Sequence, residues 1–145
     1  MFFYVLILPT LLNKNMNTAI VIIGSNYQKE SNIAKAKDLL NDYFDISVES
    51  KLVLTKAVGE NINEDFLNQA LVLHSADSAN ETIKHFKHIE DQLGRSALTQ
   101  LQGIIPIDID LVFWNGVIKR KDIDKYDFVR DCIDEVIART DIKLL

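Results

Sequence analysis

The chain has 145 residues, of which 48% are hydrophobic and 26% are charged, and this is enough for one compact domain with a sizeable core. Its formal net charge of −5 argues against general nucleic-acid binding, because such binding requires a basic surface that displaces counterions. Cys132 is the single cysteine, which excludes a disulfide or a cysteine-based zinc site within one chain and is typical of a protein of the reducing cytoplasm.

The first fifteen residues differ from the rest of the chain. Phe2 to Leu12 is an apolar run broken by Pro9, and it is too short to span a membrane. It lacks the basic start and the cleavage site of a secretory signal. We therefore expect 1–15 to be an upstream read-through before a start at Met16, or a disordered segment, with a short peripheral anchor as the alternative. The range 16–145 is expected to be a single domain that is not bound to a membrane.

The next elements alternate between strand and helix patterns. Thr18 to Ile23 is a β-branched run typical of a strand buried on both faces, and it ends at the turn Gly24-Ser25-Asn26. Apolar residues then recur at helical spacing. From Ile46 to Leu54 the period becomes two, which predicts one strand with Ile46, Val48, Leu52 and Leu54 on its apolar face.

The second half repeats this order. Residues 59–65 form a polar loop, 66–75 a third strand, and Ser78 with Glu81 a capping box that begins a helix ending at Gly94. A second loop is expected over 96–103, then a fourth strand, a turn at Asn115-Gly116 and a last amphipathic helix over 128–139. The order β-α-β-β-α-β predicts an α+β, ferredoxin-like fold, in which two helices cover one face of an antiparallel sheet, with a short C-terminal helical tail.

The fourth strand carries a pair of acids. Alternation puts Asp108 and Asp110 side by side on one face and an apolar set on the other, consisting of Ile105, Ile107, Ile109, Leu111 and Phe113. Two neighbouring carboxylates repel each other and are costly to bury unless a cation lies between them. Mg²⁺ is often held by one or two carboxylates together with substrate phosphates, so the pair predicts a metal–phosphate site. The alternative is a half-exposed edge strand that happens to carry two acids.

Four short segments, taken together and in order, resemble a known enzyme family. They are Ile22–Asn26 (I-I-G-S-N), Asp65–Asn68 (D-F-L-N), Ile89–Arg95 (I-E-x-x-L-G-R) and Gly103–Asp110, which ends in I-D-I-D. The family is 6-hydroxymethyl-7,8-dihydropterin pyrophosphokinase, a magnesium-dependent enzyme of folate biosynthesis. The resemblance extends from Met16 to Val136. It implies transfer of pyrophosphate from ATP to the hydroxymethyl group of the reduced pterin, with AMP as the second product.

The resemblance also implies roles for single residues. Asp108 and Asp110 would hold two Mg²⁺ ions, and Arg95 would pair with the ATP phosphates as a catalytic residue. The nucleotide would further contact Glu90, Lys125 and Tyr126. The pterin would bind to Thr55, Val58, Asn68 and Phe128. Structural alternatives stay open: Asn68 as a buried strand amide, Phe128 as an ordinary core residue, and Arg95 as a partner of a helix dipole.

The chain departs from the family where positive charge is expected. Residues 96–102 carry no charge where the family has arginines and a tryptophan, and Ile104 and Ile105 replace a proline and an arginine. Lys119, Arg120, Lys121 and Arg130 are candidates to face the nucleotide, although a solvated surface is the favoured interpretation. Two alternatives to the enzyme follow: a weakened or inactive relative that binds pterin or nucleotide, and a ferredoxin-like interaction domain that oligomerises through its sheet face. Apolar Leu98 and Leu101, in place of the arginine-rich loop, are the support for the second.

Overall fold

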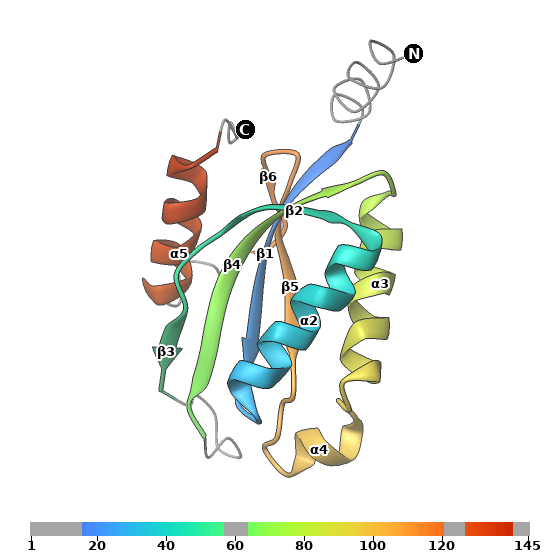
Figure 1. Cartoon of the computed structure of the whole chain (residues 1–145), viewed down its shortest axis with the longest axis vertical. Helices are drawn as coiled ribbons and strands as arrows, with labels where there is room; N and C mark the ends of the chain where they lie inside the picture. Colours follow the sequence, from blue (N-terminus) through green and yellow to red (C-terminus); the bar gives the residue numbers. More distant parts are fainter. Residues whose placement is uncertain (1–15, 57–63, 121–126, 141–145) are drawn as a thin grey trace.

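A six-stranded antiparallel sheet forms the centre of the computed structural model, which describes residues 16–56, 64–120 and 127–140 (Figure 1). The strand order is β2-β4-β1-β5-β6, and β3 also pairs with β4. The strands are β1 (Asn17–Ser25), β2 (Asp45–Glu49), β3 (Val53–Thr55), β4 (Phe66–Ser75), β5 (Asp108–Trp114) and β6 (Val117–Ile118). The predicted α+β fold is confirmed. The expectations for residues 1–15 and for most of the loop 59–65 lie outside the described residues.

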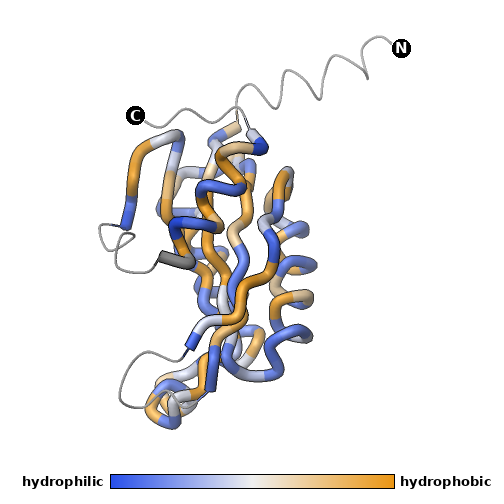
Figure 2. Tube along the Cα trace, turned by 90° about the vertical axis from the view of Figure 1, so that its left-hand side faces the viewer, coloured by the Kyte–Doolittle hydropathy of each residue, from blue (hydrophilic) through white to orange (hydrophobic). Residues whose placement is uncertain are grey.

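Strand β1 lies between β4 and β5, and this central position explains its composition. From Ala19 to Ser25 every residue is buried, as its β-branched run predicts. The strands in the middle of the molecule are mostly hydrophobic, whereas the helices carry both hydrophobic and hydrophilic residues (Figure 2). The sheet therefore has a core on each face.

Helices α2 (Lys29–Tyr43) and α3 (Ala79–Gln92) cover one face of the sheet, as predicted (Figure 1). Their core includes Leu40 and Phe86 together with Val21 and Ile23 of β1. The Oγ of Ser78 accepts a hydrogen bond from the Glu81 amide at the start of α3. The Glu81 carboxylate pairs with Lys84, so the described bonds supply one half of the predicted capping box.

Helix α5 (Asp127–Ala138) packs on the opposite face, where Cys132, Ile133 and Val136 meet the side chains of β1, β4 and β5. Glu135 accepts a hydrogen bond from the Lys51 amide at 2.7 Å, and Arg139 donates to the Glu49 carbonyl at 2.6 Å. These bonds hold the end of α5 and the residue after it against the end of β2 and the segment that joins β2 and β3. None of the helices in the described ranges is long and apolar enough to cross a membrane.

The strand predicted over 46–54 is wrong as one element, because it divides at Ser50. The Ser50 amide donates to the Ala70 carbonyl, and its Oγ accepts from the Ala70 amide, both at 2.9 Å. This side-chain bond takes the place of a regular backbone pair and interrupts the alternation. Leu52 and Leu54 are consequently 48% and 60% exposed and do not share a buried face with Val48.

The loop predicted over 96–103 contains a short helix, α4 (Ala97–Leu101). Ser96 and Thr99 form a reciprocal capping box, in which each side chain accepts the backbone amide of the other. Five residues are too few to show helical periodicity, and the caps supply the local signal. Leu98 and Leu101 of this helix are 65% and 74% exposed.

The alternation predicted for β5 is confirmed as far as Leu111 and is wrong at Phe113. Leu111 faces Val21 in the register, but the next β1 residue, Ile20, faces Phe113, so Val112 is an extra residue in β5. The bulge turns Phe113 to the α5 side of the sheet, where Val112 also packs, while Leu111 packs with the helices α2 and α3. The two aspartates precede the bulge and keep their predicted common face.

Candidate active site

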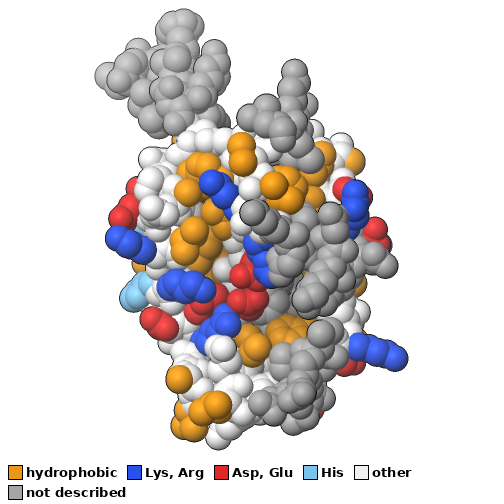
Figure 3. Space-filling view, turned by 180° about the vertical axis from the view of Figure 1, so that it is seen from behind, with side chains coloured by type: hydrophobic (Ala, Val, Ile, Leu, Met, Phe, Trp, Pro, Cys, Tyr) orange, Lys and Arg blue, Asp and Glu red, His pale blue; other side chains and the backbone are white. Residues whose placement is uncertain are grey.

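Three neighbouring strands contribute to one polar row across the sheet. Gly24 of β1 is the register partner of Asn68 on β4 and of Asp108 on β5. Register partners project to the same face, which here is the face that carries α5. Asp110 follows one pleat further on and pairs with Ile22. Figure 3 shows acidic side chains near the centre of this face with lysine and arginine side chains around them.

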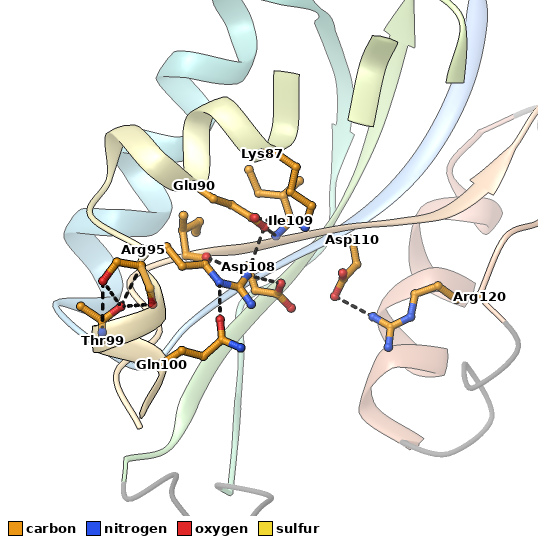
Figure 4. Close-up of polar contacts among 11 residues, drawn as sticks. Lys87, Glu90, Arg95, Thr99, Gln100, Asp108, Ile109, Asp110 and Arg120 are labelled. Carbon is orange, nitrogen blue, oxygen red and sulfur yellow. Dashed lines mark hydrogen bonds and ion pairs between the residues drawn. The ribbon is translucent and has the colours of Figure 1, made fainter. Parts of the chain in front are cut away.

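Arg95 and Glu90 complete the outer edge of β5 (Figure 4). The Arg95 guanidinium donates to the Asp108 carboxylate at 2.7 Å, to Glu90 at 3.2 Å and to the Ile107 carbonyl at 3.4 Å. Glu90, which is 3% exposed, accepts the Ile109 amide at 2.8 Å. Since the described part of β6 pairs with Phe113 and Trp114, the Glu90–Arg95 pair takes the place of a neighbouring strand here.

Arg120 holds the second aspartate. It follows the hairpin strand β6, and its guanidinium lies 2.6 Å from the Asp110 carboxylate. The favoured interpretation of Arg120 as solvated surface is therefore wrong. Each acid of the pair thus has its own arginine from a different part of the chain, and Figure 4 shows the two guanidinium groups on opposite sides of the pair.

The two carboxyls have divergent proton affinities. Burial, the hydrogen bond with Asp108 and the negative charge of that residue raise the pKa of Asp110 to about 7, against the opposing charge of Arg120. Burial also acts to raise the pKa of Asp108, but hydrogen bonds with Asp110 and Arg95 outweigh it and hold that pKa below its ordinary value. Near neutral pH Asp110 is therefore only partly ionised, whereas Asp108 carries a negative charge.

The raised pKa of Asp110 predicts a pH-dependent stability in metal-free buffer. An unfolded aspartate loses its proton near pH 4, whereas folded Asp110 keeps it to about pH 7. The folded state binds more protons in this window, so the free energy of unfolding contributed by this group falls as the pH rises from 4 to 7. Urea unfolding of the wild type and of Asp110→Asn should give stability curves that separate over this window, with the variant more stable at pH 8. Parallel stability curves of the two proteins would refute the raised pKa of Asp110.

Asn68 is fixed by the strand beside it. Its amide nitrogen donates to the Thr55 hydroxyl at 2.9 Å and to the Val53 carbonyl at 3.2 Å. The amide oxygen lies over Gly24, where an added Cβ would be 2.9 Å from it. Thr55 and Asn68, which the sequence predicted to share a site, are thus in contact. Acceptors of the protein satisfy the donor group of Asn68, as the alternative of a buried strand amide expected. Asn68 also lies in the same row across the sheet as Asp108.

A cavity of about 440 Å³ adjoins the acid pair on its outer side. Lys87, Lys119 and Arg120 supply its positive charge, and Asp110 also lines it. Its apolar wall comes from α3 and β5, through Ile83, Phe86, Ile109 and Leu111. A cavity with this wall and these cations suits a ligand that has a flat apolar part and several negative charges.

Comparison with known proteins gives one family. A family model described as 7,8-dihydro-6-hydroxymethylpterin-pyrophosphokinase (HPPK) matches residues 20–138. The chain belongs to this family. None of the curated proteins matches the chain.

Solved structures of HPPK-DHPS proteins have a similar fold. A triple mutant from Plasmodium falciparum with SDX-DHP is 15% identical, covers 83% of this chain and 33% of its own, and has a TM-score of 0.51. Another mutant of that protein with SDX-DHP is 15% identical and covers 83% of this chain and 37% of its own, with a TM-score of 0.49. This chain thus spans about a third of the length of those proteins. At this identity the first likeness supports the fold alone.

The described residues fit the magnesium chemistry of an HPPK without forming a complete metal cage. No group of three histidine, cysteine or acidic side chains in the described ranges is arranged to hold a metal. Asp108 and Asp110 offer two carboxylates on one face, each paired with a guanidinium. Such a donor set suits a hard cation that keeps other oxygen ligands from water or phosphate.

The HPPK residues implied by the resemblance divide into three groups. Asp108, Arg95 and Glu90 form one contact network with Asp110 beside it, and Thr55 contacts Asn68. Val58, Lys125 and Tyr126 lie outside the described residues, and Phe128 is in the first turn of α5 with its side chain outside the description.

Sequence reasoning missed two cations of this site. It did not single out Lys87, which lies 3.2 Å from Glu90, and it favoured a solvated surface for Arg120. The i, i+3 spacing of Lys87 and Glu90 on one helix was the available signal for Lys87. Arg120 had no comparable signal, since its position depends on where the hairpin of β5 and β6 returns the chain.

Proposed function

We propose that this chain transfers pyrophosphate from ATP to 6-hydroxymethyl-7,8-dihydropterin, giving AMP and the pterin diphosphate. The proposal rests on one observation above all. Asn68, a pterin contact in the family resemblance, and Asp108, a metal ligand in it, lie in one row on one face with only Gly24 between them. Two strand spacings correspond to about 10 Å, which leaves room for a pterin that reaches from one residue to the other.

The pterin end of this proposal uses an oriented amide. The donor group of Asn68 is held by Thr55 and Val53, so its oxygen has a fixed direction. The amide oxygen can accept a hydrogen bond from an N–H group on the edge of the pyrimidinone ring of the pterin. Val58 and Phe128 complete this pocket in the proposal, the latter by stacking on the ring.

The nucleotide end uses the cavity beside Asp110. Its apolar wall suits an adenine ring, and Lys87, Lys119 and Arg120 suit phosphates. Glu90 serves the nucleotide indirectly, because its carboxylate is occupied by Lys87, Arg95 and the Ile109 amide. Lys125 and Tyr126 are proposed as further contacts. The substrates are small molecules, and the proposed location is the cytoplasm.

The chemistry needs charge neutralisation around the phosphates. Mg²⁺ held by Asp108 and Asp110 would supply it and would polarise the attacking hydroxyl. The hydroxymethyl oxygen bonds to the β-phosphorus of ATP, the bond from that phosphorus to the α–β bridging oxygen breaks, and the hydroxyl proton is released. Arg95 keeps Asp108 ionised and in place, and it presents its remaining donors to the phosphates.

A coupled assay of AMP formation tests the proposal. With hydroxymethyl dihydropterin, ATP and Mg²⁺ at saturation, we expect AMP to form at a rate that depends on both the pterin and the metal. No turnover under these conditions would reject the proposal.

A non-catalytic pterin-binding protein is the second candidate. It is favoured by the absence of charge from residues 96–102, which include α4, where the family resemblance expects arginines. Calorimetry distinguishes the two functions, because pterin binding without Mg²⁺-dependent ATP binding favours the binding protein.

Gly24→Ala is expected to weaken pterin binding without unfolding the protein. The new Cβ would be 2.9 Å from the Asn68 amide oxygen, so the flexible amide must turn away and lose its bond to Thr55. One misplaced hydrogen bond corresponds to an affinity about tenfold lower. Calorimetric titration with the pterin measures this loss, and the NMR signals of the Asn68 side-chain amide report the turn. Unchanged affinity with a displaced amide would contradict the role of Asn68.

A further inference from the structure

The two arginines of the acid pair are held in different ways. The Arg95 guanidinium is 20% exposed and also bonds to Glu90 and the Ile107 carbonyl, so it belongs to the framework of the site. Arg120 is 38% exposed and comes from the chain just after β6, a strand of two exposed residues. Of the two, Arg120 is the more exposed, so its ion pair with Asp110 is the more accessible to a competing ligand.

The contact of Arg120 conflicts with metal binding at the same carboxylate. Its Nη1 lies 2.6 Å from Asp110 Oδ2 and occupies one of the two carboxylate oxygens through which Asp110 can bind a divalent cation. Both groups are cations, so their simultaneous approach to one carboxylate oxygen is opposed by their mutual repulsion. A metal that binds Asp110 through Oδ2 must consequently displace the guanidinium from that oxygen.

The displaced guanidinium has a destination nearby. Arg120 and Asp110 both line the cavity proposed for ATP, together with Lys87 and Lys119. A small change of the Arg120 side chain would keep it in that cavity and turn it toward phosphate oxygens, for which a guanidinium is well suited. Residues 96–102 offer no cation for this task.

We propose that Arg120 has two successive partners: it holds Asp110 in the free protein, and it moves to the phosphates of ATP when Mg²⁺ takes its place on the acid pair. Arg120 thus acts as a positioning residue that links metal binding to nucleotide binding. This inference rests on the proposed function, because it takes Asp108 and Asp110 as the metal ligands. It predicts that removal of the Arg120 charge strengthens metal binding and weakens nucleotide binding.

Arg120→Gln tests the exchange, with Arg139→Gln as the control. Arg139 is exposed just after α5 and binds the Glu49 carbonyl, so the control removes the same charge at a residue that does not line the cavity. Mn²⁺ binding without nucleotide is followed by electron paramagnetic resonance, and binding of a non-hydrolysable ATP analogue with Mg²⁺ by calorimetry. For Arg120→Gln we expect Mn²⁺ binding about tenfold tighter and analogue binding at least about tenfold weaker. Arg139→Gln should match the wild type in both.

The outcomes separate this inference from the function on which it rests. Unchanged or weaker Mn²⁺ binding by Arg120→Gln, in a protein whose wild type binds the metal, would overturn the exchange and leave the proposed function intact. No binding of Mn²⁺ by either protein, with or without nucleotide, would remove the metal site and both proposals. Arg120→Lys keeps the competing charge without the planar fork, so it should bind Mn²⁺ as the wild type does and the analogue more weakly.

Discussion

Asp110→Asn is expected to lower the rate of Mg²⁺-dependent AMP formation by about 10³-fold or more. The asparagine amide is neutral, so the site loses half of the negative charge that would hold the metal next to the phosphates. Removing one group that stabilises transition-state charge already costs about 10²–10³ in rate, and a metal ligand acts on both the attacking and the leaving oxygen.

The fold of this variant is expected to survive, which makes the result interpretable. The raised pKa of Asp110 means that its ionised form destabilises the folded protein at pH 8, so asparagine should increase the free energy of unfolding there. Asp38→Asn is a suitable control, because Asp38 is exposed on α2, on the other side of the sheet from the acid pair. Full activity in Asp110→Asn would show that the acid pair does not serve catalysis.

Arg95→Gln should have the second largest effect, with kcat lower by about 10²–10³-fold. Arg95 is the cation bonded to Asp108, and the uncharged stretch 96–102 cannot replace it. The same change leaves the buried Glu90 with one fewer charge partner, so we also expect the free energy of unfolding to fall by about 2–4 kcal/mol. Steady-state kinetics must therefore be measured below the unfolding temperature of the variant.

Arg95→Lys separates the two roles of this residue. Lysine restores a positive charge near Glu90 and Asp108 but lacks the planar fork that contacts both acids and the Ile107 carbonyl. We expect it to recover most of the stability and little of the rate. Recovery of the full rate would indicate that Arg95 serves the fold by its charge alone, as a partner of the helix end.

Local sequence patterns predict most of the strand framework of this site. The β-branched run of β1 predicted a strand buried on both faces, and the alternation before Leu111 correctly put Asp108 and Asp110 on one face. The deviations occur where a cross-strand partner decides the outcome. Val112 is an extra residue only relative to β1, and Ser50 interrupts its strand through a bond to Ala70 on β4.

The sequence predicted the acidic residues of the site, but it did not predict all of its cationic residues. Glu90 and Arg95 stand in a motif, but their role as a substitute for a strand beside Ile109 depends on α3 lying along β5. Arg120 reaches Asp110 because a two-residue hairpin strand returns the chain to that point, and no local pattern reports this contact. Long-range ion pairs of this kind are set by tertiary structure.

A crystal of the protein with a non-hydrolysable ATP analogue and Mn²⁺ gives the most direct test of the acid pair. Anomalous scattering identifies the metal without reference to the protein atoms. We expect manganese within about 2.2 Å of carboxylate oxygens of both Asp108 and Asp110, with phosphate oxygens as further ligands. Nucleotide bound elsewhere, with both carboxylates still paired to Arg95 and Arg120 and no metal between them, would contradict this assignment.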